Sequence, residues 1–211
     1  MHIKICGITT LEQALAAMDA GADLLGFNFY PPSPRAISPK TCARIIRGLH
    51  EAGRRPQTVG VFVNMPAAEM RVIMSACRLD WAQLSGDEPP GQMRQLGEIA
   101  FKAVRPATLN EALAALDAYG RASPPALLLD ARAPKSYGGS GHLANWDIAR
   151  ELARRAPIFL AGGLTPDNVA DAIHAVQPWG VDVASGVESA PGVKDPARMA
   201  AFVRAVRTAT L

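Results

Sequence analysis

The chain has 211 residues, of which 49% are hydrophobic and 19% charged, a balance typical of a globular domain with a sizeable core. The formal net charge is +3, but no dense basic run with interleaved aromatic residues predicts nucleic-acid binding. No apolar run is long enough to cross a bilayer and no signal peptide is apparent, so we expect no membrane partner. Three widely spaced cysteines predict neither a disulfide framework nor a zinc site, and they suit a reducing cytoplasm.

Short apolar runs alternate with alanine-rich amphipathic stretches along the whole chain. We predict eight strands, at residues 2–6, 24–28, 58–63, 81–84, 100–104, 126–130, 157–161 and 181–184. We predict eight helices after them, at residues 11–21, 39–53, 66–78, 91–100, 108–120, 144–155, 165–176 and 195–206. Thr108 and Thr165 are the expected N-caps of two of these helices, with Pro166 at the first helical position of the second.

The predicted strands are nearly continuous apolar runs, which is typical of parallel strands buried on both faces. Strict alternation of strand and helix implies parallel pairing with right-handed crossovers. Eight such units predict a (β/α)8 TIM barrel, formed as a single domain by residues 1–211. An open, doubly wound sheet is the alternative architecture.

In such a barrel the active site lies at the carboxyl ends of the strands, in the loops that follow them. Glycines follow the seventh and eighth predicted strands, where backbone N–H groups can approach a phosphate closely. The candidate phosphate donors are Gly162, Gly163, Ser185 and Gly186, although these glycines could simply form tight turns. The glycine-rich segment 137–142, after the sixth strand, could close over a ligand or be a plain surface loop.

Cys6 and Asp130 end the first and sixth predicted strands, so both side chains can face one pocket. A thiolate and a carboxylic acid facing one ligand form an acid–base pair. The thiol needs a lowered pKa for this, which loop N–H groups or a substrate dipole could supply, and the carboxyl needs a raised one, which burial could supply. The alternatives are a small core residue for Cys6 and a loop cap for Asp130.

Arg35, in a proline-rich loop, could bind a carboxylate or be an exposed surface arginine. Cys42 and Cys77 lie in amphipathic helices and are interpreted as structural.

Seven segments together resemble the phosphoribosylanthranilate isomerase family, an enzyme family of tryptophan biosynthesis. They are KICGIT (4–9), GADLLGFNFYPPSPRAISP (21–39), VGVFVN (59–64), QLSGDE (83–88), LLLDARAPKSYGGSGH (127–142), LAGGLTPDNV (160–169) and GVDVASGVESAPGVKD (180–195). The resemblance runs nearly from end to end and implies the same (β/α)8 barrel.

The resemblance implies an Amadori rearrangement of N-(5-phosphoribosyl)anthranilate to an open-chain carboxyphenylamino-deoxyribulose phosphate. It implies that Asp130 is the general acid, that Cys6 is the general base and that Arg35 holds the anthranilate carboxylate. It assigns the phosphate to the loops after the seventh and eighth strands, with contributions from Gly139, Ser140 and Gly141. The family needs no metal or organic cofactor. The expected partner is therefore the small-molecule substrate alone, with a cytoplasmic monomer or homodimer as the working form.

Three positions depart from the family pattern. Ser85 replaces a usual histidine, His142 replaces a usual lysine, and Ala184 replaces a common serine, so affinity and rate are in question more than reaction type.

A different sugar-phosphate enzyme is one competing hypothesis. A Schiff-base lysine at a strand end would favour this hypothesis, but neither Lys4 nor Lys102 ends its predicted strand. A phosphate-binding barrel that has lost catalysis is another, and the retained Cys6 and Asp130 argue against it.

Overall fold

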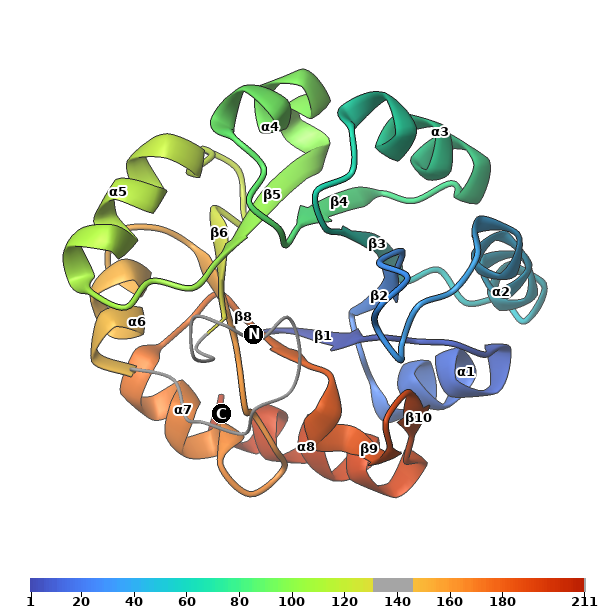
Figure 1. Ribbon diagram of the computed structural model, residues 1–211. Helices are drawn as coiled ribbons and strands as arrows, with labels where there is room; N and C mark the ends of the chain where they lie inside the picture. Colours follow the sequence, from blue (N-terminus) through green and yellow to red (C-terminus); the bar gives the residue numbers. More distant parts are fainter. Residues whose placement is uncertain (131–145, 211) are drawn as a thin grey trace.

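The eight strands close into one parallel barrel in chain order, and helices ring it on the outside (Figure 1). The structure is a computed structural model that describes residues 1–130 and 146–210. Its strands are β1 (His2–Cys6), β2 (Leu24–Asn28), β3 (Gln57–Phe62), β4 (Trp81–Leu84), β5 (Ala100–Val104), β6 (Leu127–Asp130), β7 (Ile158–Ala161) and β8 (Gly180–Val183). Each strand lies within one residue of its prediction at either end. The predicted barrel is confirmed and the open sheet is wrong, because β1 pairs with both β2 and β8.

The helices follow the strands in the predicted order. They are α1 (Leu11–Ala20), α2 (Pro39–Glu51), α3 (Ala67–Cys77), α4 (Pro90–Leu96), α5 (Leu109–Tyr119), α6 (Trp146–Ala153), α7 (Val169–Val176) and α8 (Pro196–Ala209). A short 3-10 turn, η1 (Gly97–Ile99), joins α4 to β5. Among the described helices, none is long and apolar enough to span a bilayer.

Side chains alternate between the barrel interior and the helical layer, because successive residues of a strand point to opposite faces. Ile3 and Ile5 of β1 pack into the large core beneath the helices. Lys4 lies between them and points inward, where it meets side chains of β4 and β8. The interior of the barrel holds its own smaller apolar cluster, made of Leu24, Val59, Phe101, Ala103, Leu128, Phe159 and Ala161.

Two helix starts test the predicted caps. The Thr108 side chain accepts from the backbone N–H of Glu111, so this N-cap is confirmed. The predicted N-cap at Thr165 is wrong, because α7 begins four residues later and its N-cap residue is Asn168. The Asn168 side chain accepts from Thr165 N at 2.8 Å and donates to Gly163 O at 3.0 Å, which holds the intervening residues in a turn.

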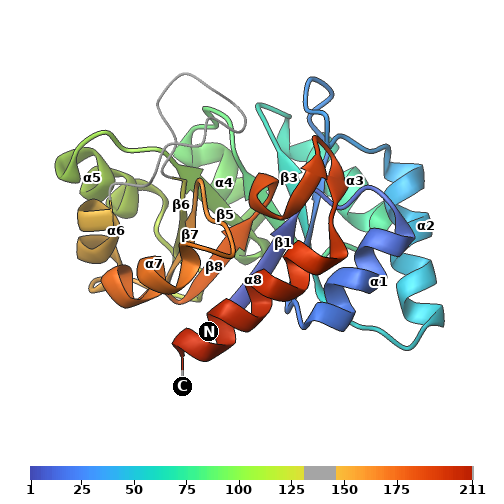
Figure 2. The same ribbon diagram turned by 90° about the horizontal axis from the view of Figure 1, so that it is seen from below.

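The segment after β8 was expected to be a loop, but it contains regular structure. A 3-10 turn, η2 (Ser185–Val187), leads into an antiparallel hairpin of β9 (Glu188–Ala190) and β10 (Val193–Lys194). Seen from the side, this hairpin rises from the same end of the barrel as the loop after β2 (Figure 2). Thr9 Oγ1 and Gln13 Nε2 donate to Gly192 O at the hairpin turn, at 3.2 and 3.1 Å. The hairpin is thereby tied to the loop after β1.

Candidate active site

Cys6 ends β1 and points into the barrel mouth. It has the same inward orientation as Lys4 two residues earlier, and only 9% of its surface is exposed. Gly26 of β2 lies opposite it in register. A Cβ atom at position 26 would lie 2.8 Å from Cys6 Sγ, so the absence of a side chain at Gly26 makes the space that the thiol occupies.

Asp130 ends β6 and shares the inward orientation of Leu128, which belongs to the interior cluster. It is 4% exposed. Its Oδ2 lies 3.6 Å from Arg105 Nε, and both terminal nitrogens of Arg105 donate to Ser85 O at 3.2 Å. Asp130 therefore lies at the same end of the barrel interior as Cys6.

Arg35 reaches from the loop after β2 across the first loop. A Cβ atom at Gly7, whose φ is +82°, would lie 2.6 Å from Arg35 Cδ. The guanidinium binds Glu188 in two-point fashion, with Nε–Oε1 at 2.8 Å and Nη2–Oε2 at 2.7 Å. The Arg35 side chain is 13% exposed, so it is not the freely exposed surface arginine that was the alternative reading.

Glu188 is shared between two cations. Lys194 donates to Glu188 Oε1 at 2.8 Å and to the carbonyl of Ala184 at 2.9 Å. Burial alone would raise the pKa of Glu188, but the hydrogen bonds and charges of Arg35 and Lys194 lower it. Burial lowers the pKa of Lys194, and its hydrogen bond to Glu188 opposes this fall. The cluster therefore places one carboxylate between two basic side chains beside the barrel mouth.

The two glycine-rich loops after β7 and β8 contact each other. Gly162 and Gly163 both have positive φ, at 96° and 67°. A Cβ atom at Gly186 would lie 1.9 Å from the Leu164 carbonyl oxygen, so only glycine permits this approach of the two loops. Ser185, at the start of η2, is exposed beside them. The predicted phosphate-binding positions 162, 163, 185 and 186 thus lie together at the carboxyl end of the barrel.

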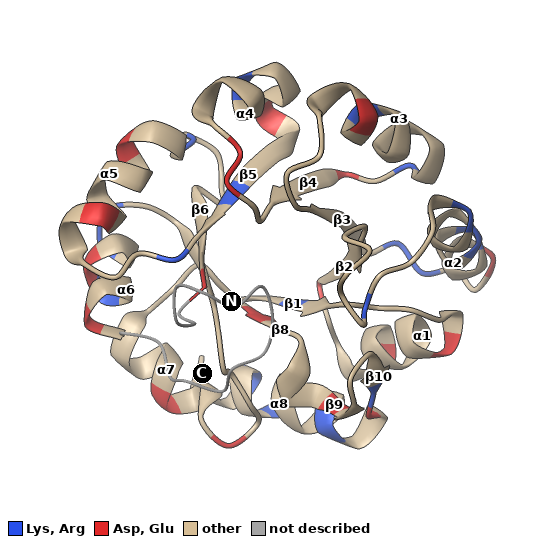
Figure 3. Ribbon diagram, viewed as in Figure 1, with Lys and Arg blue, Asp and Glu red and all other residues tan. Residues whose placement is uncertain are grey.

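Below the mouth, a hydrogen-bonded chain of polar side chains crosses the barrel interior. Lys4 Nζ donates to Gln83 Oε1 at 2.9 Å and to Asp182 Oδ1 at 3.0 Å, and Gln83 Nε2 donates to Ser85 Oγ at 3.0 Å. Figure 3 shows that β5 and β8 carry charged positions inside the ring of helices, whereas many other charges lie on the helices. No sequence motif assigns a role in this site to Lys4, Gln83, Asp182, Glu188 or Arg105, because each has at least one partner that is distant in the chain.

Burial raises the pKa of the Cys6 thiol above its usual range. The charge of Asp182 acts in the same direction, whereas the ammonium groups of Lys4 and Lys194 oppose the rise. The described residues therefore do not supply the lowered pKa expected from the sequence, because the cost of burying a thiolate outweighs the nearby positive charge.

Some predicted features lie elsewhere. Gly139, Ser140, Gly141 and His142 lie outside the described residues. Cys42 and Cys77 are buried between α2 and α3, in keeping with a structural role. Among the described residues, no group of three or more His, Cys, Asp or Glu side chains is arranged to hold a metal ion.

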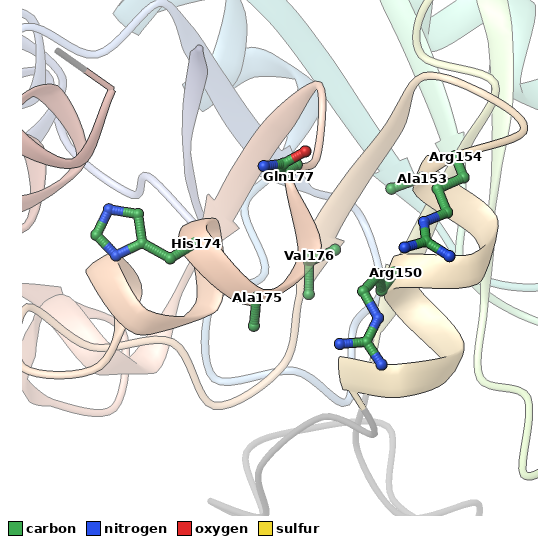
Figure 4. A pocket seen from close by; sticks show the side chains of 7 residues that line it. All are labelled: Arg150, Ala153, Arg154, His174, Ala175, Val176 and Gln177. Atoms are coloured by element: carbon green, nitrogen blue, oxygen red, sulfur yellow. The ribbon is translucent and has the colours of Figure 1, made fainter.

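A cavity of about 300 Å³ between α6 and α7 is lined by Arg150, Arg154 and His174 among others (Figure 4). It lies at the carboxyl ends of these helices and hence at the opposite end of the barrel from Cys6. Arg150 and Arg154 are paired with Asp147 and Glu151, at 2.7 and 3.0 Å. This groove is separate from the candidate active site.

Comparison with known proteins decides the family. The model of the N-(5'-phosphoribosyl)anthranilate isomerase family matches residues 3–205. The chain belongs to this family. The isomerase of Geobacter sulfurreducens is 48% identical over 204 residues, covering 97% of this chain and 97% of the relative.

Solved structures of phosphoribosylanthranilate isomerases share the fold and its extent. The crystal structure from Thermotoga maritima matches with a TM-score of 0.88 and 38% identity, covering 99% of each chain. Another isomerase structure, in complex with reduced 1-(o-carboxyphenylamino)-1-deoxyribulose 5-phosphate, matches with a TM-score of 0.84 and 35% identity, again over 99% of each chain. Isomerase family membership thus extends over the whole barrel, including every strand end described above.

Proposed function

We propose that Cys6 and Asp130 perform the Amadori rearrangement of N-(5-phosphoribosyl)anthranilate to 1-(2-carboxyphenylamino)-1-deoxyribulose 5-phosphate, by general acid–base catalysis. The reaction is the aldose–ketose isomerisation of tryptophan biosynthesis that characterises the family. The observation that carries the proposal is the common position of the two side chains, since both end barrel strands and both point into the same mouth.

Asp130 is the general acid in this mechanism. It protonates the ribose ring oxygen, the C1–O bond breaks, and the electron pair of the anthranilate nitrogen forms the C1–N iminium. Cys6, as thiolate, then removes the proton from C2, which the iminium has made acidic. The electrons of the C2–H bond form the enolamine, which tautomerises to the ketone. The substrate supplies its own electron sink, so the steps balance without a cofactor or metal.

Two anionic ends of the substrate have separate partners in this proposal. The Arg35 guanidinium binds the anthranilate carboxylate, and it retains Nη1 for this purpose because Glu188 takes Nε and Nη2. The phosphate is bound by backbone N–H groups of Gly162, Gly163, Ser185 and Gly186. The glycines have no side chain, so a phosphate can approach these N–H groups closely. Gly139, Ser140 and Gly141 remain proposed contributors to the phosphate site.

The test is a fluorescence assay that follows loss of emission from the anthranilate-type substrate. Cys6→Ser and Asp130→Asn should each lower kcat by about 10² to 10⁴, the usual range for one general acid or base. The matched controls are Cys42→Ala, a buried helical cysteine, and Asp171→Asn, an aspartate on α7, and both should turn over as wild type. Wild-type turnover in both site variants would refute the acid–base assignment.

We also propose that the chain works in the cytoplasm, as a monomer or a homodimer and as a single-domain enzyme. The composition and the three reduced cysteines support the compartment. Size-exclusion chromatography with light scattering measures the assembly directly, and a mass above that of two chains would contradict the expectation.

A further inference from the structure

Lys4 is a buried cation in the middle of the barrel that the proposed proton transfers do not use. Its side chain is 0% exposed, and its ion pair with Asp182 lies inside the ring of strands. Burial of an ammonium group is costly unless it is well paired, so a lysine here calls for a physical reason. Leu24 and Leu128, at other inward positions, show that apolar side chains also fit the interior of this barrel.

The surroundings of Lys4 fix its ammonium in one position. An ammonium has three N–H donors, and two of them bind Gln83 Oε1 and Asp182 Oδ1. Gln83 is itself oriented by Ser85, whose hydroxyl accepts from Gln83 Nε2. Three strands, β1, β4 and β8, thus contribute to holding one nitrogen atom, and a third N–H remains for another acceptor.

That third donor lies beside Cys6. A Cβ atom at Gly26 would lie 2.8 Å from Cys6 Sγ and 3.2 Å from Lys4 Cε, so the sulfur and the end of the lysine chain share the space that Gly26 leaves. Both side chains come from β1, two residues apart, and both point inward. The ammonium is therefore directly below the thiol, on the side away from the opening of the barrel.

We propose that Lys4 is a positioning residue for the isomerisation, with its fixed ammonium as the counter-charge of the Cys6 thiolate. This inference rests on the proposed role of Cys6 as the base. Asp182 and Gln83 hold the ammonium, and the Gly26 niche lets the sulfur approach it. Lys4 does not touch the substrate and transfers no proton.

The charges around Cys6 support this division of roles. Burial raises the pKa of Cys6 most strongly, and among the neighbouring cations Lys4 opposes the rise more than Lys194 does. Lys194 forms an ion pair with Glu188, which Arg35 also binds, so the charge of Lys194 is already paired with a carboxylate. Asp182 is the neighbouring anion and raises the pKa of Cys6. Burial alone would lower the pKa of Lys4, but the charges of Asp182 and Cys6 raise it, so Lys4 stays an ammonium.

The experiment measures the Cys6 thiolate without measuring turnover. Iodoacetamide alkylates thiolates, and mass spectrometry of the Cys6 peptide gives its labelling rate at each pH. Lys4→Met keeps the aliphatic chain and removes the charge. We expect its labelling profile to move upward by about one pH unit or more, so that labelling at neutral pH falls about tenfold.

A second variant should shift the pH profile of Cys6 labelling in the opposite direction. Asp182→Asn removes the neighbouring anion and keeps the ammonium, so the labelling profile should move to lower pH. A purely structural role for the Lys4–Asp182 pair predicts the same disturbance in both variants, whereas a counter-charge role predicts opposite shifts. Lys4→Gln is a second neutral variant, which also removes the charge but keeps hydrogen-bonding groups near Asp182 and Gln83, and its profile should move upward like that of Lys4→Met. If Lys4→Met does not fold, the Lys4→Gln profile decides the question, and a downward or absent shift overturns the proposal.

Lys102 provides the matched control. It is a second buried strand lysine with a carboxylate partner, Glu88, at 2.8 Å, and Cys6 is not among the groups that influence it. Lys102→Met should therefore leave the Cys6 profile unchanged. Full turnover by Cys6→Ser would refute the proposed base itself. Inactivity of Cys6→Ser together with an unshifted Lys4→Met profile would refute only the role of Lys4.

Discussion

The two ends of the barrel interior differ in chemistry. At the amino ends of the strands, Phe101 and Phe159 pack with Trp81 and Trp179 in edge-on and tilted contacts, with ring centroids 4.9 to 6.3 Å apart. At the carboxyl ends the same interior holds a thiol, a carboxyl group and a chain of polar side chains. We infer from this difference that the apolar layer provides most of the free energy of folding of the barrel interior. This stability offsets the unfavourable free energy of burying charged side chains in the polar layer at the other end.

The largest expected effect on stability comes from replacing Phe159, at the apolar end. It is fully buried, with the ring of Trp179 on one side, and Phe159→Ala should lower the free energy of unfolding by about 3 to 5 kcal/mol. Urea denaturation measures this loss, and kcat of the remaining folded enzyme should be unchanged. Val72→Ala, at a side chain that is 69% exposed, is the control and should change stability by less than about 0.5 kcal/mol. A large fall in kcat of folded Phe159→Ala would break the division between the two ends.

A smaller effect concerns binding at the polar end. Arg35→Ala should raise KM about 10- to 100-fold with little change in kcat, because a charge-assisted hydrogen bond contributes about 1.5 to 3 kcal/mol. Steady-state kinetics separate the two constants. A fall in kcat with unchanged KM would contradict a carboxylate-binding role.

Glu188, which holds Arg35, determines how KM in the same measurement should respond to pH. Its pKa is lowered from the ordinary 4.5, so its carboxylate is ionised above that pH, and the stability it contributes is lost only as pH falls through the lowered value. We therefore expect the Arg35–Glu188 pair to leave KM unchanged between pH 5 and 8. Glu188→Gln should raise KM throughout this range, by less than Arg35→Ala. The lowered pKa would be contradicted if the KM of the wild type changed with pH between 5 and 8 and the KM of Glu188→Gln did not.

The smallest expected effect lies outside the barrel. Thr108→Ala removes the side-chain acceptor at the start of α5 and should cost about 1 kcal/mol of stability, without altering kcat or KM. Thermal denaturation measures the change, and Thr108→Ser, which keeps the hydroxyl, should restore most of it. Altered KM in Thr108→Ala would show that helix caps influence the polar end.

The sequence predicts the strands well because their signal is local. Each strand is a short apolar run bounded by turn residues, and its length and flanking residues distinguish it from a buried helix. The hairpin after β8 was missed because β9 and β10 are only three and two residues long. The start of α7 was misplaced because Asn168, three residues after a good capping threonine, binds the preceding loop instead.

The candidate site divides in the same way. Cys6, Asp130 and Arg35 could be singled out from strand ends and loop composition, aided by the family resemblance. The partners that hold the site could not, because Lys4 and Asp182 are 178 residues apart and Arg35 and Glu188 are 153 apart. Contacts at such separations are created by closure of the barrel, and no local spacing encodes them.

Glu188 follows directly after η2, the turn proposed to receive the phosphate, and its carboxylate holds the guanidinium proposed to receive the anthranilate carboxylate. If both proposed roles hold, the two binding groups for the substrate's negative ends are fixed to the same short segment of chain, and their separation is set by that segment. On this proposal, a ligand whose two negative groups are spaced differently would bind one of these groups but not both, so the segment would select substrates by length before any proton transfer.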